Sequence, residues 1–237
     1  MTLEHRVAVI TGATGGLGAV LTRDLAARGA NLVLLDIDSA RLDALTSSLA
    51  LPEERFLAQT VNLLDPSEAR RAAEAAAARF GHLDVLLHVV GGWTGGKTLL
   101  EVPPTDLEFM LNQHVWTSFN VIQAFVPHLV KNGWGRVVMV TSPYAARPAA
   151  KGGPYAIGKA GQEALMLTLS QELKGTGVTA NLLQARTIDV KREKVTSPTA
   201  ENAAWTTPEE LSAAILYLLS EEGGALNGAK LPLYGSY

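Results

Sequence analysis

One turn decides the fold of this chain: Thr11-Gly12-Ala13-Thr14-Gly15-Gly16-Leu17-Gly18. It follows a short apolar run, 7–10, and precedes a helical pattern over 17–27. A glycine-rich turn between a strand and a helix lets the backbone approach a pyrophosphate, while the positive end of the helix attracts the anion. The turn therefore predicts a cofactor site. A tight turn without a ligand is the alternative, because glycine-rich loops recur in many folds.

Outward from this turn, short apolar runs alternate with longer helical patterns, which is typical of repeated βαβ units. Further strands are predicted at 31–35, 56–61, 83–90, 136–140, 178–183 and 229–233, and further helices at 66–80, 106–130, 154–174 and 208–219. We predict an α/β fold: a Rossmann-like, doubly wound parallel sheet of about seven strands with helices on both faces. No linker-like segment divides residues 1–237, which predicts a single domain.

The composition limits the partners and the compartment. With 20 Lys and Arg against 23 Asp and Glu, the net charge is −3, so no nucleic acid partner is expected. Cysteine is absent, which excludes disulfides and thiolate metal sites, and we predict no metal. The run 7–10 is too short for a signal peptide or a membrane span, and 111–130 has the polar spacing of an amphipathic helix. We therefore expect a cytoplasmic protein that does not contact a membrane.

A second group of residues indicates acid–base chemistry. Tyr155 and Lys159 lie four residues apart on the predicted helix 154–174, which places the phenol and the ammonium on one face. A fixed cation and a positively charged nicotinamide ring would lower the pKa of the phenol from about 10 toward physiological pH. Such a phenol serves as the acid in carbonyl reduction and as the base in alcohol oxidation. By itself the pair is weak evidence, because such pairs usually lie on a solvated helix face.

Taken together, these residues resemble the short-chain dehydrogenase/reductase family. The glycines at 12, 16 and 18 have the family's spacing, and Ser142 stands 13 residues before Tyr155. The resemblance implies that Ser142 holds the substrate oxygen and that Lys159 tunes Tyr155 and binds ribose. It also implies that Asn112 interrupts a helix and holds a water linked to Lys159. It spans nearly the whole chain and implies an oxidoreductase that interconverts a carbonyl and an alcohol with a nicotinamide cofactor.

The same resemblance implies the cofactor contacts. Asp36 ends the second predicted strand, where it would bond the adenosine ribose and repel a 2′-phosphate, so NAD(H) is preferred over NADP(H). A helix or turn cap is the alternative role for Asp36. Asn62 and Leu63 resemble the family's pair beside the adenine, and the backbone of Ile188 would bond the carboxamide. The predicted cofactor-binding residues are Gly12, Thr14, Gly15, Gly16, Leu17, Gly18, Asp36, Ile37, Asn62, Leu63, Val90, Gly91, Tyr155, Lys159 and Ile188.

The chain departs from the family's pattern in two places. His88-Val89-Val90-Gly91 stands where the family shows Asn-Asn-Ala-Gly, and we expect His88 to be a structural donor that replaces part of the lost bonding. After the predicted strand 178–183, Ala185, Arg186 and Val190 replace the family's Pro, Gly and Thr, which shape the nicotinamide end. Arg186 either reaches an acidic group of the substrate or lies on the surface.

Several functions stay open. Segments 91–96, 116–118, 187–189 and 205–206 are similar to the dihydropteridine reductases, a branch of the same family. A reductase of 3-oxoacyl groups on an acidic carrier protein is another candidate, with Lys191, Arg192 and Lys194 as its docking patch or as a solvated loop. A non-catalytic cofactor-binding regulator is the candidate from a different class. We expect 191–205 to form a mobile lid that selects the substrate, and the resemblance implies a homodimer or homotetramer built on the long helices.

Overall fold

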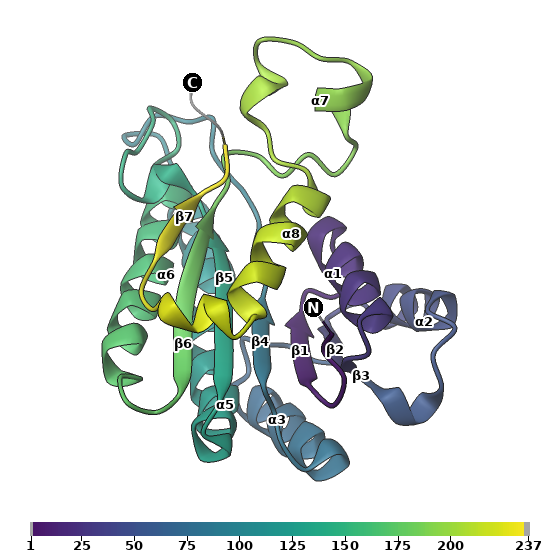
Figure 1. Ribbon diagram of the computed structural model, residues 1–237. Coiled ribbons are helices and arrows are strands. Elements are labelled where there is room, and N and C mark those ends of the chain that lie inside the picture. Colours follow the sequence, from purple (N-terminus) through teal and green to yellow (C-terminus); the bar gives the residue numbers. More distant parts are fainter. Residues whose placement is uncertain (1, 235–237) are drawn as a thin grey trace.

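The computed structural model describes residues 2–234 and contains a seven-stranded parallel sheet (Figure 1). The spatial order of the strands is β3-β2-β1-β4-β5-β6-β7, and every neighbouring pair is parallel. The strands are β1 Val7–Thr11, β2 Asn31–Asp36, β3 Phe56–Thr60, β4 Val85–His88, β5 Gly135–Thr141, β6 Val178–Gln184 and β7 Lys230–Pro232. The predicted doubly wound parallel sheet is confirmed.

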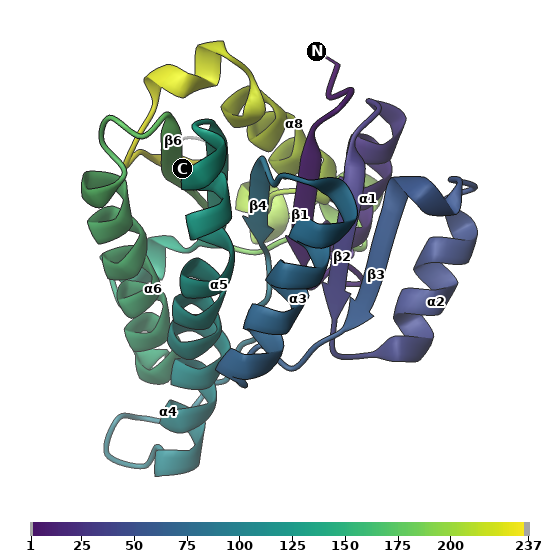
Figure 2. The ribbon, with the colours of Figure 1, turned by 90° about the horizontal axis from the view of Figure 1, so that it is seen from below.

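Helices cover both faces of this sheet (Figure 2). One face carries α3 (Pro66–Phe80), α5 (Thr117–Asn132) and α6 (Gly153–Glu172), and the other carries α1 (Gly16–Ala27), α2 (Ser39–Ser48) and α8 (Pro208–Leu219). The two shorter helices are α4 (Pro104–Leu111) and α7 (Glu193–Thr196). Each face has its own apolar core, so successive strand residues serve opposite cores: Leu86 packs in one, whereas Val85 and Leu87 pack in the other.

The strand order creates the crevice in which the site lies. The chain runs outward from β1 through β2 to β3 and then returns to place β4 on the other side of β1. In that register Thr11 pairs with His88, so the glycine turn after β1 and the segment after β4 lie next to each other. A crevice at the carboxyl ends of strands where the order reverses is the usual ligand site of open α/β sheets.

The predicted helix 106–130 is not continuous. Instead of one helix over 106–130, the structure has α4, then a π-helical segment at Asn112–Trp116, then α5. A π turn bonds residue i to i+5 and is often found at functional sites. The interruption begins at Asn112, the residue at which the family resemblance implies it. The helix α2 is not among the predicted helices; Asp38 caps its first turn by accepting a hydrogen bond from the Arg41 amide. Within residues 2–234, none of the helices has the length and apolar character needed to cross a bilayer.

Candidate active site

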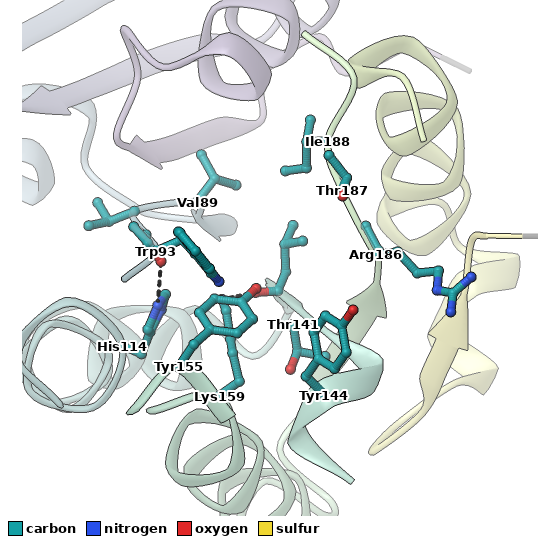
Figure 3. Close-up of a pocket in the computed structure, with 15 residues that line it drawn as sticks. Val89, Trp93, His114, Thr141, Tyr144, Tyr155, Lys159, Arg186, Thr187 and Ile188 are labelled. Carbon is teal, nitrogen blue, oxygen red and sulfur yellow. Dashed lines mark hydrogen bonds between the residues drawn. The ribbon is translucent and has the colours of Figure 1, made fainter. Parts of the chain in front are cut away.

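A cavity of about 630 Å³ opens beyond the carboxyl ends of β4, β5 and β6 (Figure 3). Of the predicted residues, Val90, Gly91, Tyr155, Lys159 and Ile188 line it. The other lining residues are Val89, Gly92, Trp93, His114, Val140, Thr141, Tyr144, Ala185, Arg186 and Thr187. The cavity therefore brings together residues from the ends of three strands and from the helix that carries the tyrosine.

Tyr155 and Lys159 both point from α6 into this cavity, as their four-residue spacing predicts. Lys159 is almost fully buried, and its Nζ donates to the carbonyl oxygen of Val140 at 2.8 Å and to Oε1 of Gln162 at 2.9 Å. The same Nζ lies 6.0 Å from the centre of the Tyr155 ring. Two of the three ammonium hydrogens therefore form hydrogen bonds, which hold the lysine side chain in one orientation.

The pKa values in the cavity are set mainly by burial. Burial lowers the pKa of Lys159 to about 7, and nearby Glu163 opposes this shift. Burial raises the pKa of Tyr155, while a hydrogen bond with the Ser142 hydroxyl acts in the opposite direction. The expected lowering of the tyrosine pKa is therefore not what the structure shows. Desolvation of the phenolate is the largest cause of this rise, and the neighbouring Tyr144 acts in the same direction.

Ser142 lies where the sequence predicts, directly after β5. It is fully buried, and its Oγ accepts a hydrogen bond from the Tyr144 amide at 3.3 Å, which caps a short 3₁₀ turn. This bond fixes the hydroxyl beside Tyr155, whose ring also contacts Tyr144 edge-on with centres 6.4 Å apart. A hydroxyl and a phenol held together in this way are able to bond one substrate oxygen from two sides.

Asn112 does interrupt the helical run, because it begins the π segment, but it is not among the residues that line the cavity. His114, two residues farther along, is fully buried and lines it. The His114 ring meets the Tyr155 ring edge-on, with centres 5.5 Å apart and planes at 82°. His114 is not among the predicted site residues, and its only signal in the sequence is a histidine two residues after Asn112.

His88 acts as a structural tether, as the sequence predicts. It is fully buried, and its Nδ1 lies 2.7 Å from the Thr11 hydroxyl on β1. The Thr117 hydroxyl donates to the Gln113 carbonyl, so it is free to accept from Nε2 of His88 at 3.4 Å. Burial, reinforced by the charge of Lys159, lowers the pKa of His88 to about 3. The ring is therefore neutral and joins β4 to β1 and to the start of α5.

The glycine turn has the geometry that a closely bound pyrophosphate requires. Gly12 has a φ of 67°, and a β-carbon there would lie 3.2 Å from the Val90 amide nitrogen. A β-carbon on Gly18 would overlap the Gly12 carbonyl oxygen, and one on Gly16 would overlap the side chain of Val190. The absence of a side chain at Gly12 lets the turn lie against the segment after β4, and its absence at Gly18 lets the turn close on itself. The turn, with Thr14, Gly15 and Leu17, opens α1 and so presents the amides that an anion needs.

Asp36 is fixed at the end of β2 by the glycine turn itself. Its Oδ2 accepts from the Thr14 amide at 2.9 Å and from the Thr14 hydroxyl at 2.7 Å. Its Oδ1 accepts from the amides of Ile37 and Asp38 at 2.8 and 3.3 Å. The helix cap next to it is Asp38, so capping α2 is not the role of Asp36. Arg41 stands close by, with its guanidinium 2.7 Å from the Thr14 carbonyl oxygen.

The remaining predicted cofactor residues lie outside the cavity. Ile37 is 71% exposed next to Asp36. Asn62 is exposed, and its Oδ1 already accepts from the Leu64 amide at 3.1 Å. Leu63 is buried in the core that contains α3 and α5. The side chain of Leu63 thus packs inside the protein, whereas Asn62 keeps its amide group at the surface.

The loop after β6 is held to α8 by ion pairs. Asp189 accepts hydrogen bonds from the amides of Glu193 and Lys194 and thereby begins α7. Lys194 pairs with Glu210 at 2.7 Å, Arg192 with Glu209, and Lys191 with Glu193 at 3.8 Å. Each cation of the predicted docking patch therefore already faces a carboxylate of this chain. In the part of the chain that the structure describes, no group of three or more His, Asp or Glu side chains has a metal-binding arrangement.

Comparison with known proteins gives a family for this arrangement. Residues 6–201 match the family described as short chain dehydrogenase. The chain is 28% identical to a 3-oxoacyl-[acyl-carrier-protein] reductase of Thermotoga maritima, covering 99% of this chain and 98% of that protein. It is 30% identical to a 1-deoxy-11-beta-hydroxypentalenate dehydrogenase of Streptomyces exfoliatus, covering 93% and 84%. Neither of these relatives is described as a dihydropteridine reductase, so that weaker resemblance gains no support from them.

Solved structures share the fold. The crystal structure of levodione reductase superposes with a TM-score of 0.87 at 22% identity, covering 98% of this chain and 97% of that one. A 3-ketoacyl-(acyl-carrier-protein) reductase of Brucella melitensis, complexed with NADH, has the same TM-score and identity and covers 98% of both chains. At 22% identity this similarity establishes the fold alone.

Proposed function

Because this chain belongs to the short-chain dehydrogenase family and is an oxidoreductase of that family, we propose that it interconverts a carbonyl and an alcohol with NAD(H). One observation carries the proposal. The phenol of Tyr155 and the ammonium of Lys159 border one cavity, and the buried Ser142, which is not among its lining residues, lies close enough for its hydroxyl to oppose the rise in the pKa of Tyr155. This is the set of groups that polarises a carbonyl oxygen and supplies its proton.

The residues present fit a nicotinamide dinucleotide. The glycine turn and the first turn of α1 would hold its pyrophosphate, Asp36 its adenosine ribose, and Lys159 its other ribose. Gly91 and the backbone at Ile188 border the cavity where the nicotinamide end would lie. When bound, the nicotinamide would supply the hydride in reduction and accept it in oxidation.

The chain's own residues would handle the proton. In reduction the Tyr155 hydroxyl would donate to the carbonyl oxygen of the substrate, which Ser142 holds in place. Burial favours this role, because it raises the pKa of Tyr155 and keeps the phenol protonated. In oxidation the phenolate would take the alcohol proton, and the nearby Lys159 ammonium would stabilise that charge.

Asp36 supports the choice of NAD(H). A carboxylate at the end of β2 accepts hydrogen bonds from ribose hydroxyls and repels a 2′-phosphate. Both of its oxygens accept hydrogen bonds from backbone amides, which keeps the carboxyl group in position. The solved 3-ketoacyl-(acyl-carrier-protein) reductase complexed with NADH is a structural neighbour with this cofactor.

The test is Tyr155→Phe with Tyr144→Phe as the matched control, since both phenols line the cavity. After NADH and NADPH titrations by fluorescence, a panel of ketones and secondary alcohols is assayed with the tighter cofactor. Tyr155→Phe should lose at least ~10²-fold in kcat with unchanged cofactor affinity, whereas Tyr144→Phe keeps turnover. Unchanged turnover of Tyr155→Phe would disprove the mechanism. Failure of the wild-type protein to bind either cofactor would favour the regulator alternative.

Reduction of a 3-oxoacyl group on a carrier protein is the second candidate. The Thermotoga maritima relative supports it because the two proteins match over their whole lengths. The docking surface would not be 191–194, whose cations are ion-paired. Arg147 and Arg186 border a neighbouring cavity of about 460 Å³, and neither guanidinium has an ion-pair partner among the described residues. Carrier-bound substrate should then react faster than a free thioester, and Arg147→Gln should remove only that advantage.

A further inference from the structure

A second cavity lies beside the catalytic one, and the proposed acid–base chemistry does not use it. It is the space of about 460 Å³ that Arg147 and Arg186 border, at the carboxyl ends of β6 and β7. Tyr144 and Arg186 line both cavities, so the two spaces meet at these side chains. A substrate whose carbonyl lies against Tyr155 therefore has room to extend past Tyr144 into the second cavity.

The second cavity carries positive charge that the protein does not neutralise. Its described lining residues include three cations, Arg147, Arg186 and Lys230, and no Asp or Glu. Lys230 has a counter-ion, because its Nζ lies 3.0 Å from Oε2 of the buried Glu163. The guanidinium groups of Arg147 and Arg186 form no ion pair or hydrogen bond with any described residue. A concave space lined by charges of one sign attracts ions of the opposite sign.

The turn that places Ser142 also places Arg147. The Ser142 hydroxyl accepts from the Tyr144 amide at 3.3 Å, and the Arg147 amide donates to the Pro143 carbonyl oxygen at 3.0 Å. These bonds fix the backbone from the serine, through the tyrosine, to the arginine. Groups carried on one fixed turn keep a constant separation, which suits a site that binds a substrate at two points.

Arg186 reaches the second cavity from the segment after β6. It is the second residue after this strand, and the Ala185 amide before it donates to the Thr141 carbonyl oxygen at 3.1 Å. The Arg186 side chain points away from Tyr155 and extends beyond Tyr144 (Figure 3). Since the family's pattern has a glycine at this position, the guanidinium is a feature of this chain that the family's common chemistry does not require.

We propose that the second cavity is a substrate subsite for an oxyanion, and that the substrate is a carbonyl compound or alcohol whose far end carries a carboxylate or a phosphate. Arg147 and Arg186 bind that group, because the guanidinium fork matches the oxygens of both anions. The ring centres of Tyr144 and Tyr155 lie 6.4 Å apart, so several bonds separate the anion from the reacting carbon. This inference rests on the proposed function for turnover, whereas binding of the anion is a property of the cavity alone.

Three ketones with the same spacer test the subsite: levulinate, its uncharged methyl ester, and the phosphate ester of 5-hydroxypentan-2-one. With NADH, kcat/KM should be at least ~10-fold higher for one of the two anions than for the methyl ester, and the better anion identifies the group that the cavity binds. Arg147→Gln and Arg186→Gln should each remove most of this advantage, mainly through KM. Arg70→Gln is the matched control, because it removes a cation on α3 outside both cavities and should keep the advantage.

Binding without turnover separates this inference from the proposed function. Calorimetry of the wild-type protein, alone and with NAD⁺, which cannot reduce a ketone, should show at least ~10-fold tighter binding of an anionic ketone than of the methyl ester. Equal affinities, or a preference that survives Arg147→Gln combined with Arg186→Gln, would overturn the proposal. A rate advantage confined to carrier-bound thioesters would overturn it too, and would assign both arginines to the carrier protein. If Tyr155→Phe is fully active while the binding preference holds, the proposed mechanism fails and the subsite stands.

Discussion

The side chain of Val190 lies directly over Gly16, so that the segment after β6 rests on the glycine turn after β1. The family's threonine is replaced here by a valine that is 46% exposed. Its two γ-carbons would lie 2.4 and 2.6 Å from a β-carbon built on Gly16, so only glycine fits beneath the valine in this position. Two ends of the crevice that are far apart in the sequence are therefore in contact.

This contact predicts different outcomes for two alanine substitutions in the turn. Gly18→Ala would press a methyl group into the backbone of Gly12, which cannot move away, so unfolding should become easier by about 1–3 kcal/mol. Gly16→Ala displaces only the half-exposed Val190 side chain, and its cost should stay below about 1 kcal/mol. Urea denaturation measures both. Equal losses of stability would contradict this interpretation of the turn.

Gly16→Ala should nevertheless weaken cofactor binding, because the added methyl stands where a pyrophosphate approaches the amides of the turn. The dissociation constant for NADH should rise at least ~10-fold by fluorescence titration, which corresponds to about 1.4 kcal/mol. Unchanged NADH affinity in this variant would place the pyrophosphate elsewhere.

Asp36→Asn should change the choice of cofactor. The substitution removes the charge that repels a 2′-phosphate, and Arg41 already stands close to the turn. The ratio of NADPH to NADH affinity should rise at least ~10-fold in titrations of the purified protein. Asp38→Asn is the control, since asparagine also caps a helix and the same amount of charge is lost two residues away. A comparable change in the control would mean that general electrostatics, and not Asp36, selects the cofactor.

Lys159 should make the protein more stable at alkaline pH. Its pKa is lowered from 10.5 to about 7 in the folded protein, so between these values the unfolded chain binds more protons. Stability therefore rises with pH across this window, since the charge no longer has to be buried. Relative to Lys159→Met, the wild-type protein should gain on the order of 3 kcal/mol from about pH 7 to about pH 10. If the free energy of unfolding of the wild-type protein and of Lys159→Met changes with pH in parallel, the pKa of Lys159 is not lowered.

His88 should make the protein less stable in acid, through the same linkage in a lower pH window. Its pKa is lowered from 6.5 to about 3, so below pH 6.5 the unfolded chain takes up a proton that the folded protein refuses. The contribution of His88 to stability is fully present above the pKa of the unfolded chain, 6.5, and is lost as the pH drops toward 3. His88→Asn should lose about 2 kcal/mol less than the wild-type protein between about pH 7.5 and about pH 5. The prediction fails if both proteins lose the same free energy of unfolding over that range.

The order of residues along the chain is enough to predict the sheet and the place of the cavity. The alternation of apolar runs and helical patterns required a parallel sheet, and the glycine turn marked its first crossover. The four-residue spacing of Tyr155 and Lys159 put both groups on one face, because helical geometry fixes which neighbours meet. These features depend on periodicity and local backbone geometry, which residue order expresses directly.

The residues that meet across the cavity, and their pKa values, follow from the packing of distant segments and could not be predicted from residue order. The π turn brought His114 to the wall and left Asn112 outside it, because a shift from i+4 to i+5 bonding turns each side chain to a new direction. The raised pKa of Tyr155 likewise follows from burial that no local pattern specifies. Val190 reaches Gly16 because two segments that are far apart in the sequence converge at one edge of the sheet. Contacts between distant segments and desolvation arise only when the layers pack, so these parts of the site came from the fold.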